Sequence, residues 1–206
     1  MINTEWYTIR ALTLPATAVA LLYTFLIVWL ILRLQFSKKY AEIYADAVFT
    51  FMIVWKFSLF FTDFKAVIAQ PISLLYFNGG TIGVFLGVLA ALWQVWRKKA
   101  VVVDLKAYCW AMVLTQSIYQ WFAVLLNNNS VIGEVMTLVV LSLLTIFILW
   151  KLTALKQSLL LYTVGFILVA FFQPLGIWQT AVGVSLLLLC MGIVIHHNEN
   201  NAGGKA

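Results

Sequence analysis

The 206-residue chain is 64% hydrophobic and only 10% charged, whereas a soluble domain has about 25% charged residues. A soluble protein of this length could not bury so much apolar surface, so the composition predicts an all-α, polytopic membrane protein. The net charge of +6 does not indicate nucleic-acid binding, because the cations cluster beside apolar segments, where anionic lipid head groups attract them.

Seven apolar segments follow one another, most of them close to the roughly 20 residues that a helix needs to cross a bilayer. We predict transmembrane spans at about 14–34, 44–62, 79–96, 105–126, 133–150, 157–172 and 177–195. The first of these is too long for the apolar part of a cleaved signal peptide. No linker or internal repeat divides the chain, so residues 1–206 are expected to form a single transmembrane domain.

The basic residues predict the orientation of these spans. Ten of the thirteen Lys and Arg residues fall in every second gap, at the span ends that border it, or in the C-terminal tail: Arg33, Lys38, Lys39, Arg97, Lys98, Lys99, Lys106, Lys151, Lys156 and Lys205. Cytoplasmic loops collect Lys and Arg. We therefore expect the N-terminus outside and the C-terminus in the cytoplasm.

Lys56 is the one cation well inside a predicted span, because Arg33 and Lys106 lie at the very ends of theirs. Such a charge is costly in a membrane and is usually turned inward or paired. It could hold a lipid phosphate in a cavity, or it could extend toward the outer interface and Asp63, seven residues on. Asp46 and Asp104 lie near inner helix starts, where the helix dipole favours an acid.

Small residues recur every four positions at Gly79, Gly83 and Gly87, which is typical of close helix packing. The pair Gly79-Gly80 could also let the backbone approach an anion at the head of the helix. Glu134 opens the fifth predicted span, either as a partner of the helix dipole or as a cavity carboxylate.

Gln173 and Gln179 flank the last outer turn. Their amides could satisfy loop backbone, or could donate to and accept from a lipid head group. Cys109 and Cys190 lie in different segments and indicate no redox pair. His196 and His197 have no third ligand nearby, so we expect no metal site and no cofactor.

The order of these landmarks resembles the bacterial prolipoprotein diacylglyceryl transferase family along nearly the whole chain. The resemblance is carried by Lys56, where that family has an arginine; by residues 70–80, QPISLLYFNGG; by Gly83 and Gly87 followed by Arg97-Lys98-Lys99 and Asp104; by Glu134; by Phe171-Phe172-Gln173-Pro174; and by Trp178-Gln179. It implies seven spans with the N-terminus outside, in the bacterial cytoplasmic membrane. It also implies transfer of diacylglycerol from phosphatidylglycerol to a lipoprotein cysteine.

The chain departs from the family at several of its signature residues. Residues 81–87 contain no histidine, residues 120–127 contain no arginine, and Gln173 stands where the family has arginine. The outer head domain is missing as well, so the transfer reaction could have been lost or changed.

Three functions follow as hypotheses. The first is an active or altered transferase with a head-group site for phosphatidylglycerol made by Lys56, Gly79, Gly80, Glu134, Gln173 and Gln179. The second is a non-catalytic relative that binds lipid, a lipoprotein precursor or another membrane protein. The third is a small transporter, which the lack of a series of intramembrane charges disfavours.

Overall fold

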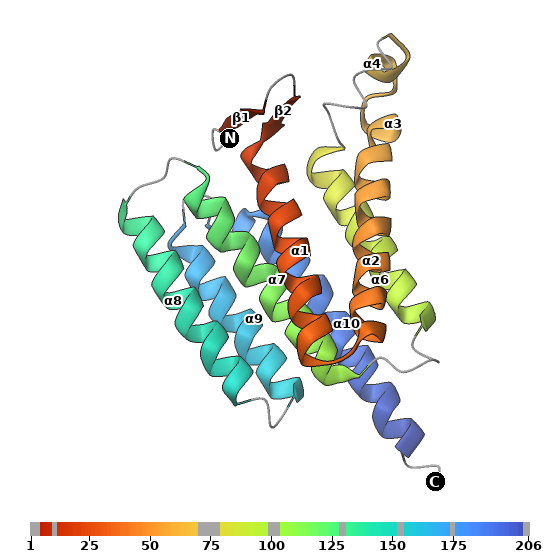
Figure 1. Ribbon diagram of the computed structural model, residues 1–206, viewed down its shortest axis with the longest axis vertical. Helices are drawn as coiled ribbons and strands as arrows, with labels where there is room; N and C mark the ends of the chain where they lie inside the picture. Colours follow the sequence, from red (N-terminus) through yellow and green to blue (C-terminus); the bar gives the residue numbers. More distant parts are fainter. Residues whose placement is uncertain are drawn as a thin grey trace.

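The computed structural model describes residues 5–9, 12–69, 79–98, 104–127, 131–151, 155–173 and 176–203. Apart from a short N-terminal hairpin, these residues are predominantly helical, and several helices are long and apolar (Figure 1). The protein is therefore membrane-embedded, as its composition predicts. Residues 70–78, which carry part of the family resemblance, lie outside the described residues.

A two-stranded hairpin precedes the first helix. Strands β1 (Trp6–Ile9) and β2 (Leu12–Pro15) pair antiparallel, and α1 (Ala16–Gln35) begins directly after Pro15. The Tyr7 hydroxyl donates to the Leu126 carbonyl at 2.9 Å, which ties the hairpin to the end of a distant helix. An all-α prediction did not include this hairpin.

The next segment is a helical hairpin. Helix α2 (Lys38–Phe57) is followed by α3 (Leu59–Thr62) and α4 (Phe64–Ala69), and α6 (Gly80–Lys98) packs against α2. Helix α2 starts six residues before the span predicted from residue 44. It ends just before Ser58, whose hydroxyl donates to the Trp55 carbonyl at 2.7 Å.

The second half of the chain consists of α7 (Leu105–Leu125), α8 (Val131–Trp150), α9 (Leu155–Phe171), the short 3₁₀ helix η2 (Gly176–Trp178) and α10 (Thr180–Gly203). Asp104 caps α7, because its carboxylate accepts from the Lys106 backbone N–H at 2.8 Å. This capping role agrees with the expectation from the helix dipole. Helix α10 continues well past residue 195, where the last span was expected to end.

Among the described residues, five helical segments are long and apolar enough to cross a membrane: α1, α2 with α3, α6, α8 and α10. Helix α9 is apolar but shorter. Helix α7 has 21 residues and carries five of the polar side chains that line the cavity described below. Each of the seven predicted segments thus coincides largely with a helix.

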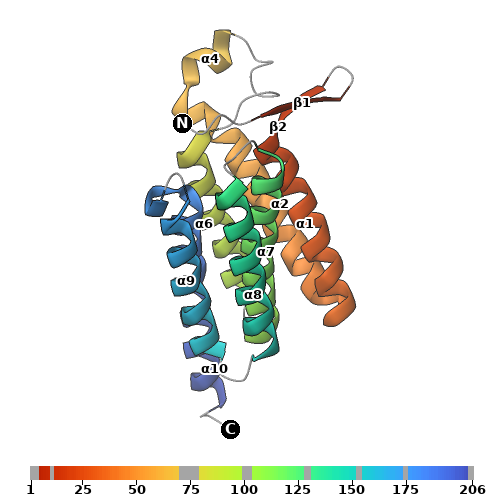
Figure 2. The same ribbon diagram turned by 90° about the vertical axis from the view of Figure 1, so that its left-hand side faces the viewer.

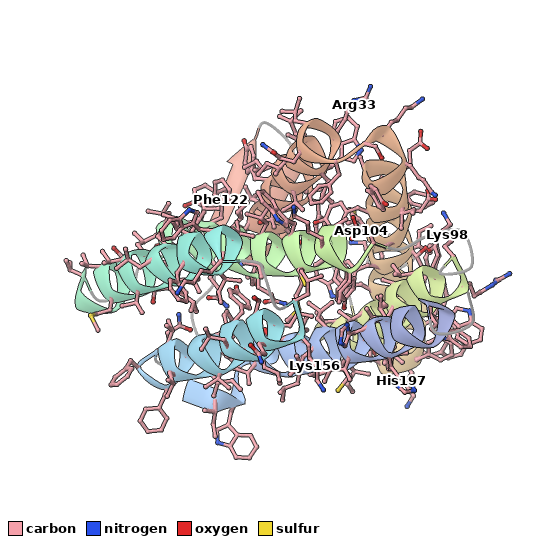
Figure 3. All side chains as sticks on the ribbon, turned by 90° about the horizontal axis from the view of Figure 1, so that it is seen from below. Arg33, Lys98, Asp104, Phe122, Lys156 and His197 are labelled. Atoms are coloured by element: carbon pink, nitrogen blue, oxygen red, sulfur yellow. The ribbon has the colours of Figure 1, made fainter. Side chains whose placement is uncertain are left out.

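Successive long helices run in alternating directions, so their connections alternate between the two ends of the molecule (Figures 1 and 2). The hairpin and α4 lie at the end opposite the C-terminus. The basic residues at the ends of α1, α6 and α9, of which Arg33, Lys98 and Lys156 are labelled in Figure 3, lie toward the C-terminal end. The alternation of basic gaps in the sequence therefore corresponds to one basic end of the bundle.

The glycines at four-residue spacing, Gly79, Gly83 and Gly87 (the glycine stripe), pack α6 against α2 within one chain. A Cβ added at Gly87 would lie 2.9 Å from the carbonyl oxygen of Phe51, and one added at Gly79 or Gly83 would overlap the Ser58 hydroxyl. Close approach of the two backbones thus depends on these positions lacking a side chain. The expected packing role of the stripe is confirmed.

Hydroxyl groups join α7, α8 and α9 in the buried interior. The Ser117 hydroxyl is hydrogen-bonded to Thr145 Oγ1 at 2.6 Å and to the Tyr162 hydroxyl at 2.8 Å. All three side chains are almost fully buried. Buried hydroxyl hydrogen bonds therefore hold α7, α8 and α9 together as one unit beside the α2–α6 pair.

Candidate functional site: a central cavity

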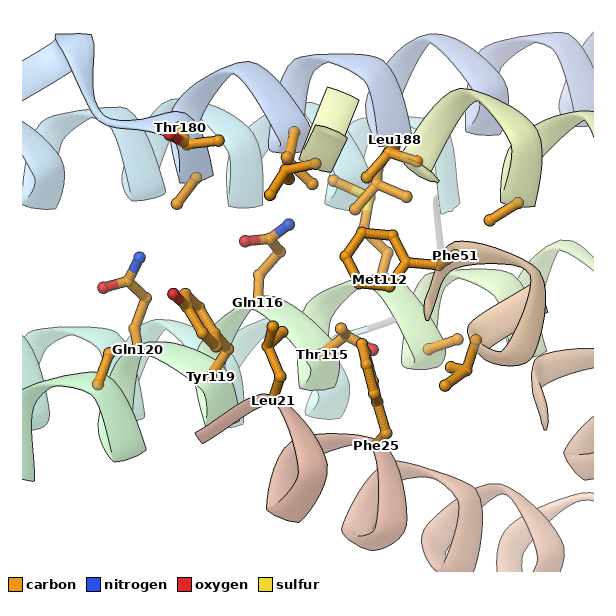
Figure 4. Close-up of a pocket in the computed structure, with 18 of the residues that line it drawn as sticks. Leu21, Phe25, Phe51, Met112, Thr115, Gln116, Tyr119, Gln120, Thr180 and Leu188 are labelled. Atoms are coloured by element: carbon orange, nitrogen blue, oxygen red, sulfur yellow. The ribbon is translucent and has the colours of Figure 1, made fainter. Parts of the chain in front are cut away.

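A cavity of about 780 Å³ lies between α1, α2, α6, α7 and α10, with a few residues added by α8 and the α9–α10 turn (Figure 4). Its size is within the roughly 300–1,000 Å³ of ligand pockets. Most of its wall is apolar. The polar side chains that line it are Thr17, Tyr40, Tyr44, Thr81, Tyr108, Thr115, Gln116, Tyr119, Gln120, Asn127, Thr137, Gln173, Gln179 and Thr180.

Helix α7 supplies the polar side of the cavity. Gln116 and Gln120 are one helical turn apart and therefore share a face of the helix. Figure 4 shows both carboxamides, with the Tyr119 side chain between them in sequence, extending from α7 into the cavity. The two glutamines are only 4% and 6% exposed.

These two carboxamides are unpaired. Among the described residues, neither Gln116 nor Gln120 has a hydrogen-bond partner, although both side chains are buried. Their amide atoms are open to the cavity and are not among the fully enclosed polar atoms without a partner. A group in the cavity that both donates and accepts hydrogen bonds could therefore pair with them.

A second set of amides lies at the end of the cavity toward the α9–α10 turn. Gln179 Nε2 donates to Gln173 Oε1 at 2.8 Å, and Gln173 Nε2 donates to Thr137 Oγ1 at 3.0 Å. This chain links the start of α10 to α8 through the intervening turn. Because these amides are paired, they hold α8 and the α9–α10 turn together at this end of the cavity.

Hydrogen bonds also join the helices that form the cavity wall, from the middle of α7 toward its N-terminus. The Tyr44 hydroxyl is bonded to Thr115 Oγ1 at 2.9 Å, joining α2 to α7. The Tyr108 hydroxyl donates to the Leu188 carbonyl at 2.6 Å, joining α7 to α10. The lining of this part is otherwise mainly apolar and includes Ala47, Leu92 and Met112.

No charged side chain is found among the described residues that line the cavity. The ion pair of Lys98 with Asp46 joins α6 and α2 at the basic end and is partly exposed, and neither side chain is among the lining residues. The site therefore combines a long apolar wall with uncharged donors and acceptors. Such a lining suits an uncharged amphiphile better than an ion.

Three of the six residues predicted from sequence line this cavity: Gly80, Gln173 and Gln179. Gly80 has φ +58°, a conformation that favours glycine. Gly79 is buried behind it against Ser58. The structure thus brings the α9–α10 turn and the head of α6 to one site.

The two charged residues among the six predicted, Lys56 and Glu134, do not line the cavity. Lys56 is half-buried on α2, and Glu134 is half-buried in the first turn of α8. Neither is among the lining residues, although their neighbours Trp55 and Gly133 are. Their head-group role stays a prediction.

Sequence reasoning missed Gln116 and Gln120. The available signal was two carboxamides four residues apart inside an apolar segment, which places them together on one helical face. Their significance depends on a cavity that only the packing of five helices creates. In the described part of the chain, no group of three His, Cys, Asp or Glu side chains is placed to hold a metal ion.

The protein is thus a membrane-embedded helical protein. Its cavity is uncharged among the described residues, and its polar groups gather on α7 and at the α9–α10 turn. Comparisons with protein-family models, with curated proteins and with solved structures find no match for this chain.

Proposed function

We propose that the chain is a seven-span protein of the bacterial cytoplasmic membrane with its N-terminus outside and its C-terminus in the cytoplasm. The alternating helix directions and the single basic end of the bundle support this topology. In that orientation, Gln173 and Gln179 face the outer leaflet. The resemblance to prolipoprotein diacylglyceryl transferases leads to the same arrangement.

Its function, in this proposal, is to bind a membrane lipid in the central cavity without transferring it. The observation that carries the proposal is the lining itself, which is largely apolar, polar along α7 and at the outer turn, and uncharged among the described residues. A lipid requires this combination, because its chains need an apolar wall and its head needs a few directed hydrogen bonds.

The same lining argues against the transfer reaction. Moving diacylglycerol from phosphatidylglycerol to a thiol needs cations to stabilise phosphate charge and a base to take the thiol proton. Lys56 and Glu134, the side chains predicted for such roles, are not among the residues that line the cavity. We therefore favour the non-catalytic relative over the transferase.

Two measurements on the full chain test this function. Lipid extracted from the protein purified in mild detergent should contain a tightly held lipid in near-stoichiometric amount, with less in a variant that fills the cavity, such as Ala111→Phe. Expression in a strain depleted of its transferase should not restore lipoprotein lipidation. Restored lipidation that Lys56→Ala abolishes would instead establish the enzyme, with phosphatidylglycerol and a lipoprotein precursor as its substrates.

A further inference from the structure

The buried carboxamides of α7 indicate which lipid the cavity takes. Gln116 and Gln120 are 4% and 6% exposed, extend into the cavity, and have no hydrogen-bond partner among the described residues (Figure 4). Each carboxamide offers two N–H donors and one carbonyl acceptor. Together they match a head that carries both hydroxyl and carbonyl groups.

The surroundings favour an uncharged head over an anionic one. An anion in a buried site needs a cation or several directed donors nearby, because burying an unpaired charge is very unfavourable. The described residues that line the cavity provide no Lys or Arg. The amides of Gln173 and Gln179 at the α9–α10 turn carry no charge, and each already uses one N–H in a hydrogen bond within the protein, so they neutralise no anion.

The depth of the two glutamines also constrains the ligand. Gln116 lies near the middle of α7, and the wall beyond it toward the basic end includes Ala47, Leu92 and Met112. A ligand whose head reaches Gln116 therefore places an acyl chain along this apolar wall. Its head must leave the level of the outer interface, which an uncharged head does at much lower cost than a phosphate.

We propose that Gln116 and Gln120 bind the hydroxyl and ester groups of an uncharged acylglycerol, so that the cavity selects neutral glycerolipids over anionic phospholipids. This inference rests on the lipid-binding function proposed above and specifies its ligand. The selectivity arises from α7, whereas Gln173, Gln179 and Thr137 brace one end of the cavity.

The test uses the full chain in nanodiscs with two photoreactive lipids of identical acyl chains, a diacylglycerol and a phosphatidylglycerol. Labelled residues are located by mass spectrometry. We expect the diacylglycerol probe to label residues that line the cavity several-fold more than the phosphatidylglycerol probe. Replacement of both glutamines, Gln116→Leu with Gln120→Leu, should lower this labelling by about tenfold, as expected for two lost hydrogen bonds. The control Gln157→Leu, on the exposed surface of α9, should leave it unchanged.

A charge-adding variant provides a second readout. Gln120→Lys should reverse the preference toward phosphatidylglycerol, because it supplies the missing cation. Equal or stronger labelling of the cavity by phosphatidylglycerol in the unmodified chain would overturn the neutral-lipid inference while leaving lipid binding intact. Unchanged diacylglycerol labelling in the double variant would also overturn it. Absence of cavity labelling by both probes would contradict the proposed function itself.

Discussion

Gln179 donates a hydrogen bond to Gln173 at 2.8 Å across the turn between α9 and α10, and Gln173 in turn donates to Thr137 on α8 at 3.0 Å. Two glutamines six residues apart thus join α8 to the α9–α10 turn at one end of the cavity. This relationship explains why both line one site.

Gln173→Leu should destabilise the protein by about 1–3 kcal/mol. The substitution removes both hydrogen bonds and leaves the buried Thr137 hydroxyl and the Gln179 amide to find other partners. The change can be measured from denaturant-induced unfolding in mixed micelles. Gln157→Leu, which makes the same change on an exposed surface, should alter stability by less than about 0.5 kcal/mol. Equal effects of the two variants would refute the bracing role of Gln173.

Gly87→Ala should loosen the α2–α6 pair. The new Cβ would lie 2.9 Å from the Phe51 carbonyl oxygen, and backbone cannot rotate away as a flexible side chain can, so a loss of about 1–3 kcal/mol is expected. Val139→Ile adds a group of the same size on an exposed face of α8 and serves as the control. If Gly87→Ala were neutral in the same unfolding assay, the two backbones would not be in close contact.

The hydroxyl cluster of α7, α8 and α9 should show coupling between its members. Tyr162→Phe and Ser117→Ala each remove one partner of the 2.8 Å contact, and interhelical hydrogen bonds in membrane proteins contribute about 0.6 kcal/mol and at most about 1.7. A double-mutant cycle on unfolding free energies should therefore give a coupling of roughly that size. Additive effects would show that the two hydroxyls do not interact.

How much of this architecture follows from the sequence depends on the element. The long apolar segments predicted the helices well, because hydropathy over about 20 residues is a strong signal. The start of α2 was misplaced, because its first turn carries Lys38 and Lys39 and hydropathy cannot detect a polar extension of a helix. The same limitation explains the extended end of α10.

The candidate site was less predictable. Gln173 and Gln179 were identified because they flank one turn, which sequence proximity reveals. Gln116 and Gln120 became significant only through the arrangement of α1, α2, α6 and α10 around α7. A cation in an apolar segment made Lys56 a candidate for the site. Which side of α2 faces the cavity, however, is determined by packing with α6.

The predicted topology can be tested by cysteine accessibility. In a background with Cys109→Ala and Cys190→Ala, the exposed positions Phe172→Cys and Lys156→Cys lie at opposite ends of α9. A membrane-impermeant maleimide should label Phe172→Cys in intact spheroplasts, and Lys156→Cys only after lysis. The reverse pattern would invert the proposed orientation and place the α9–α10 turn at the cytoplasmic side.

The central claim is that the cavity beside α7 holds a lipid. An experimental structure of the full chain in nanodiscs made from native membranes tests it most directly. We predict elongated density inside the cavity, with its head within hydrogen-bonding distance of Gln116 and Gln120 and a chain along the wall at Leu92 and Met112. Density of water-sized peaks alone in the cavity, with lipid only around the outside of the bundle, would contradict the claim.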